Sequence, residues 1–272
     1  SLVEGYDIVV ASAAMPAIMK HMDVGATSAG FMLSSAILGM ACGSLLFGTV
    51  GDHIGRRHAI AICVSLFSVF TVLTSFTNDP ITFCIVRFIA GLGLGGALPC
   101  MVALLTEYSP TRLRSRMVTL MFVGFPRGAV IAAEMGQSVL ADHGWQVMFL
   151  AATVPLLLVP LILIRLPESM QFLLRAGRID ELKKIVSRLD PTFHPRPDDR
   201  FFLPAEDRVD GTPIRHLFLA GRGFSTVMLW LAMFMCLLIG YANASWLTKL
   251  MISAGHDVPT ALHLLVVLQI GI

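Results

Sequence analysis

Long apolar stretches recur along this chain and constrain its fold more than any other feature. Crossing a bilayer as a helix takes about 20 predominantly apolar residues. Windows of that order with few or no charges cover Ala26–Val50, Ala59–Asn78, Pro80–Thr106, Met117–Ala141, Trp145–Ile164 and Gly223–Thr248, and shorter ones cover Ile8–Met19 and Val258–Ile272. We therefore predict an all-α membrane protein with eight spans, of which the first and the last are incomplete.

The composition supports a bilayer as the solvent of this chain. It is 56% hydrophobic and only 14% charged, whereas soluble domains carry about 25% charged residues. The net charge of +2 is too small to indicate a nucleic-acid partner. The histidines show no metal-binding spacing, and no nucleophile–base or metal cluster indicates an enzyme. We expect a monomer with no cofactor other than the proton as coupling ion.

The basic residues fall on alternate connections. We number the eight windows in chain order, beginning with Ile8–Met19. Of the 20 Lys and Arg, 16 lie on the connections after the second, fourth and sixth windows, while Lys20 and Lys249 lie on the opposite side. Arg87 and Arg127 lie within windows. Because Lys and Arg are retained on the cytoplasmic side, the first set of connections is predicted to be cytoplasmic in a multi-pass protein of the inner (plasma) membrane.

Residues 167–221 form the one long polar segment. It carries nine basic residues, nine acidic residues and six prolines. Its first part predicts two short amphipathic helices with a break at Gly177, and "PTFHPRPDD" predicts an extended linker. We therefore divide the chain into a six-helix bundle at 1–166, a cytoplasmic connector at 167–221 and the start of a second bundle at 222–272. This is the organisation of a two-bundle transporter.

The glycine-rich run "GLGLGG" at 91–96 has the spacing of a dinucleotide-binding loop. It lies, however, in the middle of an apolar window, where lipid permits no exposed strand-to-helix turn. In a membrane helix, Gly91 and Gly95 form a small-xxx-small pair, with Gly96 beside them, that allows a second helix to approach closely. We predict helix packing here and not nucleotide binding.

The stretch "GTVGDHIGRRH" carries the most specific motif. Gly48 and Gly55 would allow tight helix ends, and Asp52, Arg56 and Arg57 place opposite charges near helix termini. The order G-x-x-x-D-x-x-G-R-R resembles the loop between the second and third helices of the major facilitator superfamily. The resemblance implies the major facilitator fold, with this loop as a latch for one conformation. His53 stands where that family usually has Arg or Lys.

Three further stretches resemble the aromatic acid:proton symporter branch of that superfamily. They are "EGYDIVVASAAMP", "RFIAGLGLGGALPCMVALLTEYSP" and "PESMQFLL". Departures are Glu4 for the first Asp, Cys100 for the usual Asn, and "WLTKLM" where W-L-P is common. The resemblance implies that Arg87 and Glu107 occupy positions that matter, with Glu107 in the latch. The alternative for Glu107 is an ion pair with Arg112 or Arg114.

Charges inside the membrane are expensive and mark functional candidates. Asp7 falls about midway along the first span, and Glu4 lies one helical turn before it on the same face. A carboxylate there can take up and release a proton as its hydration changes. Each carboxylate can alternatively form a structural ion pair with a neighbouring helix.

Two arginines within spans are candidates for binding an organic anion. A guanidinium matches a carboxylate as a bidentate fork. Arg87 can hold a substrate carboxylate or pair with Glu134, which we expect at similar depth. Arg127 lies nearer mid-membrane and shares a helix face with Glu134.

The seventh window adds groups that suit an aromatic ring: Tyr241, Asn243 and Trp246, although Trp246 can instead anchor the helix at the membrane interface. We expect a secondary active transporter, working by alternating access, that imports a small aromatic carboxylate by proton symport. Its partners are then a small organic anion and the lipid bilayer. The alternatives are a carrier of the same fold that imports or exports a sugar, another metabolite or a drug, and a receptor or scaffold that does not transport.

Overall fold

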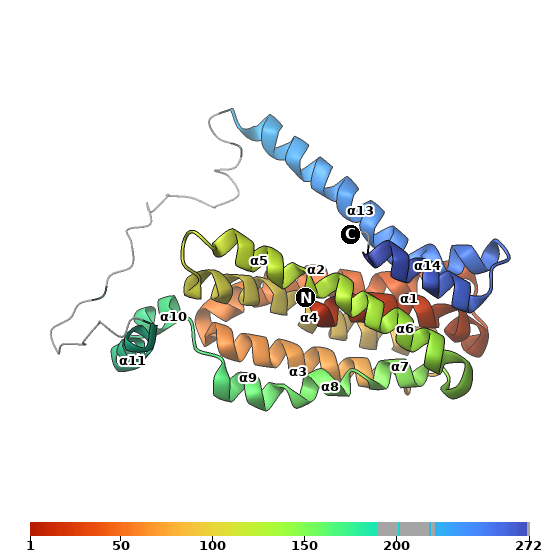
Figure 1. Cartoon of the computed structure of the whole chain (residues 1–272), viewed down its shortest axis with the longest axis horizontal. Coiled ribbons are helices and arrows are strands. Elements are labelled where there is room, and N and C mark those ends of the chain that lie inside the picture. The colour runs from red at the N-terminus through yellow and green to blue at the C-terminus, as the bar shows by residue number, and fades with distance from the viewer. Residues whose placement is uncertain (190–200, 202–217, 219–220, 271–272) are drawn as a thin grey trace.

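The computed structural model describes residues 1–189, 201, 218 and 221–270, and every regular element in them is a helix (Figure 1). The helices are α1 (Leu2–Met22), α2 (Ala26–Ile54), α3 (Arg56–Thr74), α4 (Pro80–Tyr108), α5 (Arg114–Phe122), α6 (Gly124–His143), α7 (Gln146–Leu150), α8 (Thr153–Leu157), α9 (Val159–Arg165), α10 (Met170–Arg175), α11 (Ile179–Leu189), α13 (Gly223–Ser253) and α14 (Val258–Ile270). Seven helical stretches of this part are long and apolar enough to cross a membrane. The predicted all-α membrane fold is therefore confirmed.

The spanning helices run up and down between two ends of the bundle. We call the end at which Gly55 and Leu166 join consecutive helices the basic end, and the end at which Asp23 and Gly255 do so the opposite end. The two short helices α10 and α11 lie beyond the basic end (Figure 1), separated at Gly177 as predicted, where φ is +70°. The linker predicted at 191–199 lies outside the described residues.

Glycines bring α2 and α4 into backbone contact. A Cβ atom added to Gly91 would lie 2.2 Å from the carbonyl oxygen of Ala36, and one added to Gly95 would lie 2.1 Å from that of Met40. A Cβ on Gly96 would lie 2.6 Å from the Phe47 side chain. No larger residue fits at such distances, so the predicted packing role of this run is confirmed. Its position inside α4 also excludes a phosphate-binding turn.

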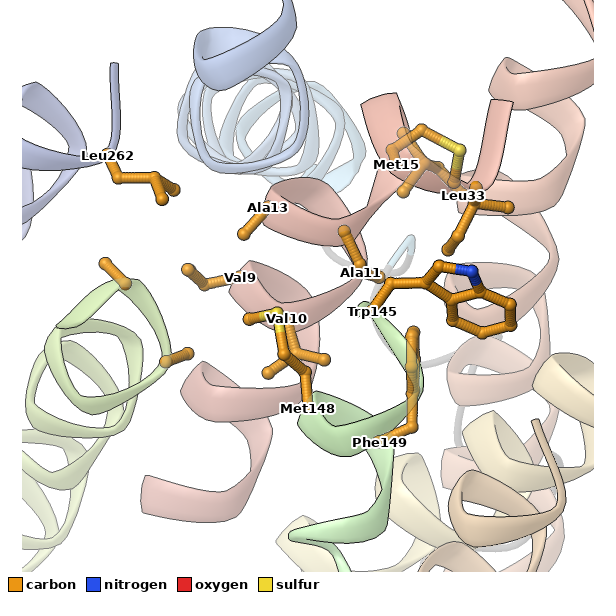
Figure 2. Packing of buried hydrophobic residues seen from close by; sticks show 14 of the residues in the cluster. Val9, Val10, Ala11, Ala13, Met15, Leu33, Trp145, Met148, Phe149 and Leu262 are labelled. Atoms are coloured by element: carbon orange, nitrogen blue, oxygen red, sulfur yellow. The ribbon is translucent and has the colours of Figure 1, made fainter. Parts of the chain in front are cut away.

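α1 lies at the centre of the main hydrophobic core. Figure 2 shows Val10 beside Met148 of α7, Leu262 of α14 on the side of Val9 and Ala13, and Leu33 of α2 beside Met15. Met148 of α7 and Leu262 of α14 are both fully buried in this cluster. The core therefore joins the first bundle to the first helices of the second.

Several helix boundaries differ from the apolar windows. α1 begins at Leu2, earlier than the window, because its two carboxylates are buried in the bundle and the helix continues through them. α2 continues to Ile54, so the prediction that Gly48 permits a helix end is wrong: Gly48 lies inside the helix. The connection to α3 is Gly55 alone, with φ of +93°.

The fifth and sixth windows are each broken into shorter helices. α5 ends before Val123, and the stretch after Trp145 forms α7, α8 and α9 in place of one helix. Pro155 and Pro160 lie in that stretch and have no backbone N–H to donate. At the last joint the hydrogen bonding tightens to an i−3 pattern, from Leu158 N to Pro155 O at 3.1 Å.

Among the described residues, α13 contacts the first bundle from Tyr241 onward, toward the opposite end. From Gly223 to Gly240 the side chains of α13 are mostly exposed, and burial begins at Tyr241. Figure 1 shows the first part of α13 leaning away from the other helices toward the basic end. α14 packs against α6. The two bundles are therefore apart at the basic end and in contact at the opposite end.

Candidate functional site

A buried ion pair joins α1 to α4. Arg87 Nη1 donates to Asp7 Oδ1 at 2.7 Å and Nη2 donates to Oδ2 at 2.8 Å, so the guanidinium and the carboxylate form a bidentate fork. Both side chains are only 2% exposed. Such a pair holds two charges away from water only while both partners are present.

Aromatic rings line the side of this pair that faces α7. The Arg87 guanidinium carbon lies 5.7 Å from the centroid of the Phe149 ring, within reach of a cation–π contact. Phe83 and Trp145 each meet Phe149 edge to face. The pair therefore lies in an apolar setting, where opposite charges attract strongly and water is excluded.

The structure corrects the alternative partner of Arg87. Glu134 is exposed on α6 and makes no ion pair with Arg87, whose fork is filled by Asp7. Arg127 is exposed on the same face of α6, as its spacing predicted, and forms no salt bridge to any described residue. Helix rotation decided the outcome, since α6 turns its small residues toward α1.

Glu4 lies one turn before Asp7 and is 5% exposed. Tyr241 Oη of α13 donates to Glu4 Oε1 at 3.4 Å, so this carboxylate links the two bundles. The structure thus brings Tyr241 to the predicted site. Asn243 is exposed and Trp246 packs at Gly30 of α2, near the opposite end. The roles predicted for these residues stay predictions.

A second charged cluster lies at the basic end of the first bundle. Arg56 pairs with Glu107, and its Nη2 lies 3.5 Å from Asp52 Oδ1. Glu107 also accepts hydrogen bonds from Ser169 Oγ at 2.8 Å and from Met170 N at 3.0 Å. The expected alternative partners of Glu107, among the arginines after Pro110, are wrong. The carboxylate instead joins α3, α4 and α10.

Glu168 is the residue of this cluster that sequence reasoning missed. Its carboxylate accepts from the backbone N–H of Arg57 at 3.0 Å and lies 3.1 Å from His58 Nδ1. Tyr108 Oη donates to its carbonyl oxygen at 2.6 Å. The sequence did contain a signal for this residue, because "PESMQFLL" begins with a proline at the end of a span and Glu168 follows that proline directly. Its partner was not, because the α2–α3 joint lies far away in sequence.

Within the described part of the chain, no group of three or more His, Cys, Asp or Glu side chains could hold a metal ion. The arrangement instead offers a buried ion pair in the bundle and a network of carboxylates and arginines at its basic end. Neither contains a nucleophile with an adjacent base.

Comparison with known proteins supplies the family. The profile of the family described as "Sugar (and other) transporter" matches residues 1–205. The benzoate transport protein of Acinetobacter baylyi is 39% identical over 98% of this chain, and the 4-hydroxybenzoate transporter PcaK of Pseudomonas putida is 30% identical over 98%. The chain spans 59% and 60% of the length of these relatives.

Solved structures show the same fold. The xylose transporter XylE from E. coli, in a partially occluded inward open conformation, superposes with a TM-score of 0.76 over 99% of this chain and 67% of its own, at 19% identity. With a matching family profile, close relatives and this fold, the assignment is complete. The chain belongs to the sugar (and other) transporter family of the major facilitator superfamily, a family of transporters and not of enzymes.

Proposed function

We propose that the chain is part of a secondary active transporter that imports a small aromatic carboxylate by proton symport. The observation that carries this proposal is the bidentate Asp7–Arg87 pair, buried within the membrane-spanning helices. Relatives named for benzoate, gallate and 4-hydroxybenzoate support the substrate class. The basic end then faces the cytoplasm of a cell whose inner membrane holds the protein.

The ion pair suggests how proton and anion are coupled. Asp7 occupies both arms of the Arg87 guanidinium, which leaves no bidentate position for a second carboxylate. Protonation of Asp7 removes its charge and frees the guanidinium for a substrate carboxylate of the same geometry. When the substrate leaves, Asp7 releases its proton and pairs with Arg87 again. One proton therefore accompanies one anion.

Other groups would complete the site. Glu4 and Tyr241 join the two bundles beside the pair, so their hydrogen bond changes when the bundles move. Arg127 is a second candidate for the substrate carboxylate, because it lies exposed on α6 without a salt bridge among the described residues. Aromatic faces from α13 would contact the ring.

Alternating access would use the two ends of the bundle. The bundles are in contact at the opposite end and apart at the basic end, an arrangement open toward the proposed cytoplasm. The network of Arg56, Glu107 and Glu168 belongs to the first bundle and its connector. We propose that it latches the connector to this bundle and biases one conformation.

Uptake by the full-length protein in proteoliposomes tests the proposal. With an inward proton gradient, we expect saturable uptake of labelled 4-hydroxybenzoate that benzoate and protocatechuate inhibit and glucose does not. Undissociated acid crosses lipid unaided, so protein-free liposomes and the Asp7→Asn variant are the controls. If Asp7→Asn retains full gradient-driven uptake, the coupling role is wrong.

The alternatives predict other outcomes in the same assay. A sugar carrier is inhibited by glucose, and an exporter moves the label outward from loaded vesicles. A receptor or scaffold binds the acid and gives no saturable uptake above the protein-free control. Because the proposed symport of one proton with one monovalent anion moves no net charge, uptake at a fixed pH gradient should not change when a potassium diffusion potential is imposed.

A further inference from the structure

An ammonium group lies buried near the opposite end, where the two bundles meet. The Lys249 Nζ atom of α13 is inaccessible to solvent and has no hydrogen-bond partner among the described residues. Lysines near the ends of membrane helices normally extend so that the charged group reaches water. Lys249 does not, so anchoring at the membrane interface does not explain it.

Trp246 holds this ammonium in place. Nζ lies 5.0 Å from the centroid of the Trp246 ring, a cation–π contact one helical turn back on α13. The indole in turn packs at Gly30 of α2, where an added Cβ would lie 3.5 Å from Trp246 Cζ2. The charge therefore lies at the seam between α13 of the second bundle and α2 of the first.

No acidic side chain of the described chain compensates this charge. The carboxylates at this end whose side chains the structure describes, Asp23, Asp79 and Asp257, are exposed, and none forms an ion pair with Lys249. A cation–π contact offsets only part of the desolvation of a buried ammonium. An anion that accepts a hydrogen bond from Lys249 Nζ would compensate the charge and satisfy the ammonium.

We propose that Lys249 is an outer binding position for the carboxylate of an aromatic anion, with Trp246 orienting the ammonium. This inference rests on the proposed transport of aromatic carboxylates and adds a position that the Asp7–Arg87 pair does not supply. When the seam between α13 and α2 opens, Lys249 offers an anion a buried cation between the opposite end and Arg87. An ammonium there selects anions over neutral rings of the same shape.

The test compares Lys249→Met with Lys20→Met, which removes the other lysine of this end, an exposed one on α1. Because a hydrogen bond to a charged group is lost, the KM for benzoate should rise about tenfold to a hundredfold in Lys249→Met, while the maximal rate changes less than about twofold. Lys20→Met should match the wild type. Lys249→Arg should restore most of the loss, since it keeps the charge.

Binding of benzoate to the purified protein, followed by calorimetry in detergent, gives a second readout. The dissociation constant should rise by the same factor in Lys249→Met, and the preference for benzoate over neutral benzamide should shrink equally. Met fits a buried position, and a thermal unfolding scan shows whether each variant is folded. If the wild type takes up benzoate and Lys249→Met keeps its KM and its preference, the outer position is wrong and the proposed function stands. If the wild type neither takes up nor binds any aromatic acid, both are wrong.

Discussion

Breaking the Asp7–Arg87 pair should have a large and specific effect on stability. Each side chain is 2% exposed, and the fork has two short hydrogen bonds. Removing one partner leaves the other charge buried without compensation, which costs about 3–5 kcal/mol. We therefore expect Asp7→Asn and Arg87→Gln each to lower the free energy of unfolding by about that amount.

The double variant distinguishes a true pair from two unrelated losses. With both charges gone, the neutral amides can hydrogen-bond to each other and no ion is left buried. The loss in Asp7→Asn/Arg87→Gln should therefore be smaller than the sum of the single losses by about 2 kcal/mol or more. Reversible unfolding in mixed micelles, followed by circular dichroism, measures all four free energies.

A surface pair provides the control. Arg178 and Glu181 on the polar connector form a short ion pair at 2.6 Å, but their side chains are 42% and 48% exposed. Such pairs contribute about 0.2–1 kcal/mol, so Arg178→Gln should have little effect. Single losses at Asp7 and Arg87 that add to within about 0.5 kcal/mol would refute the reasoning, because independent sites behave in that way.

Two further predictions concern a helix–helix contact and the ionisation of a helix N-cap. Gly95→Leu should prevent folding or expression, because even its Cβ would lie 2.1 Å from the Met40 carbonyl oxygen. Gly48→Ala is the control and should behave as the wild type, because nothing lies within 4 Å of an added Cβ there. The yield of monodisperse protein measures both, and a normal yield of Gly95→Leu would contradict the close packing. The hydrogen bonds that Thr82 donates to Asp79, the N-cap of α4, lower the pKa of this carboxyl below its ordinary 3.8. Because the pKa of Asp79 is lower in the folded state, the stabilisation is present above pH 3.8 and is lost as the pH falls through the folded pKa. Asp79→Asn keeps a cap and should remove this part of the acid dependence of the free energy of unfolding. If that acid dependence is the same in Asp79→Asn as in the wild type, Asp79 does not contribute to it.

The sequence predicted those features that depend on local pattern. Apolar length placed the spans, loop charge distinguished the two ends, and the small-xxx-small pair at Gly91 and Gly95 indicated close helix packing. All three follow from neighbouring residues and the physics of the bilayer. The breaks around Pro155 were also visible in principle, since proline cannot donate within a helix.

Partners between helices could not be predicted in the same way. The sequence offered Arg87 a substrate carboxylate or Glu134 as its partner and did not pair it with Asp7, because the rotation of α1 and α6 about their axes decides which carboxylate faces Arg87. That rotation follows from tight glycine contacts such as Gly128 against Leu2. The partner of Glu168 depended likewise on how far α2 extends. The polar residues in the last turns of α2 made its end difficult to predict from the sequence.

The joint at Gly55 has a consequence for compensating mutations. Its φ of +93° disfavours any side chain, and an added Cβ would also lie 2.6 Å from Glu168 Oε2. These two obstacles are independent, one in the backbone and one in space. Shortening Glu168 relieves only the second and gives up the hydrogen bond to Arg57 N as well. A genetic screen should therefore find no second-site suppressor at position 168 for a substitution of Gly55, and revertants should restore glycine itself.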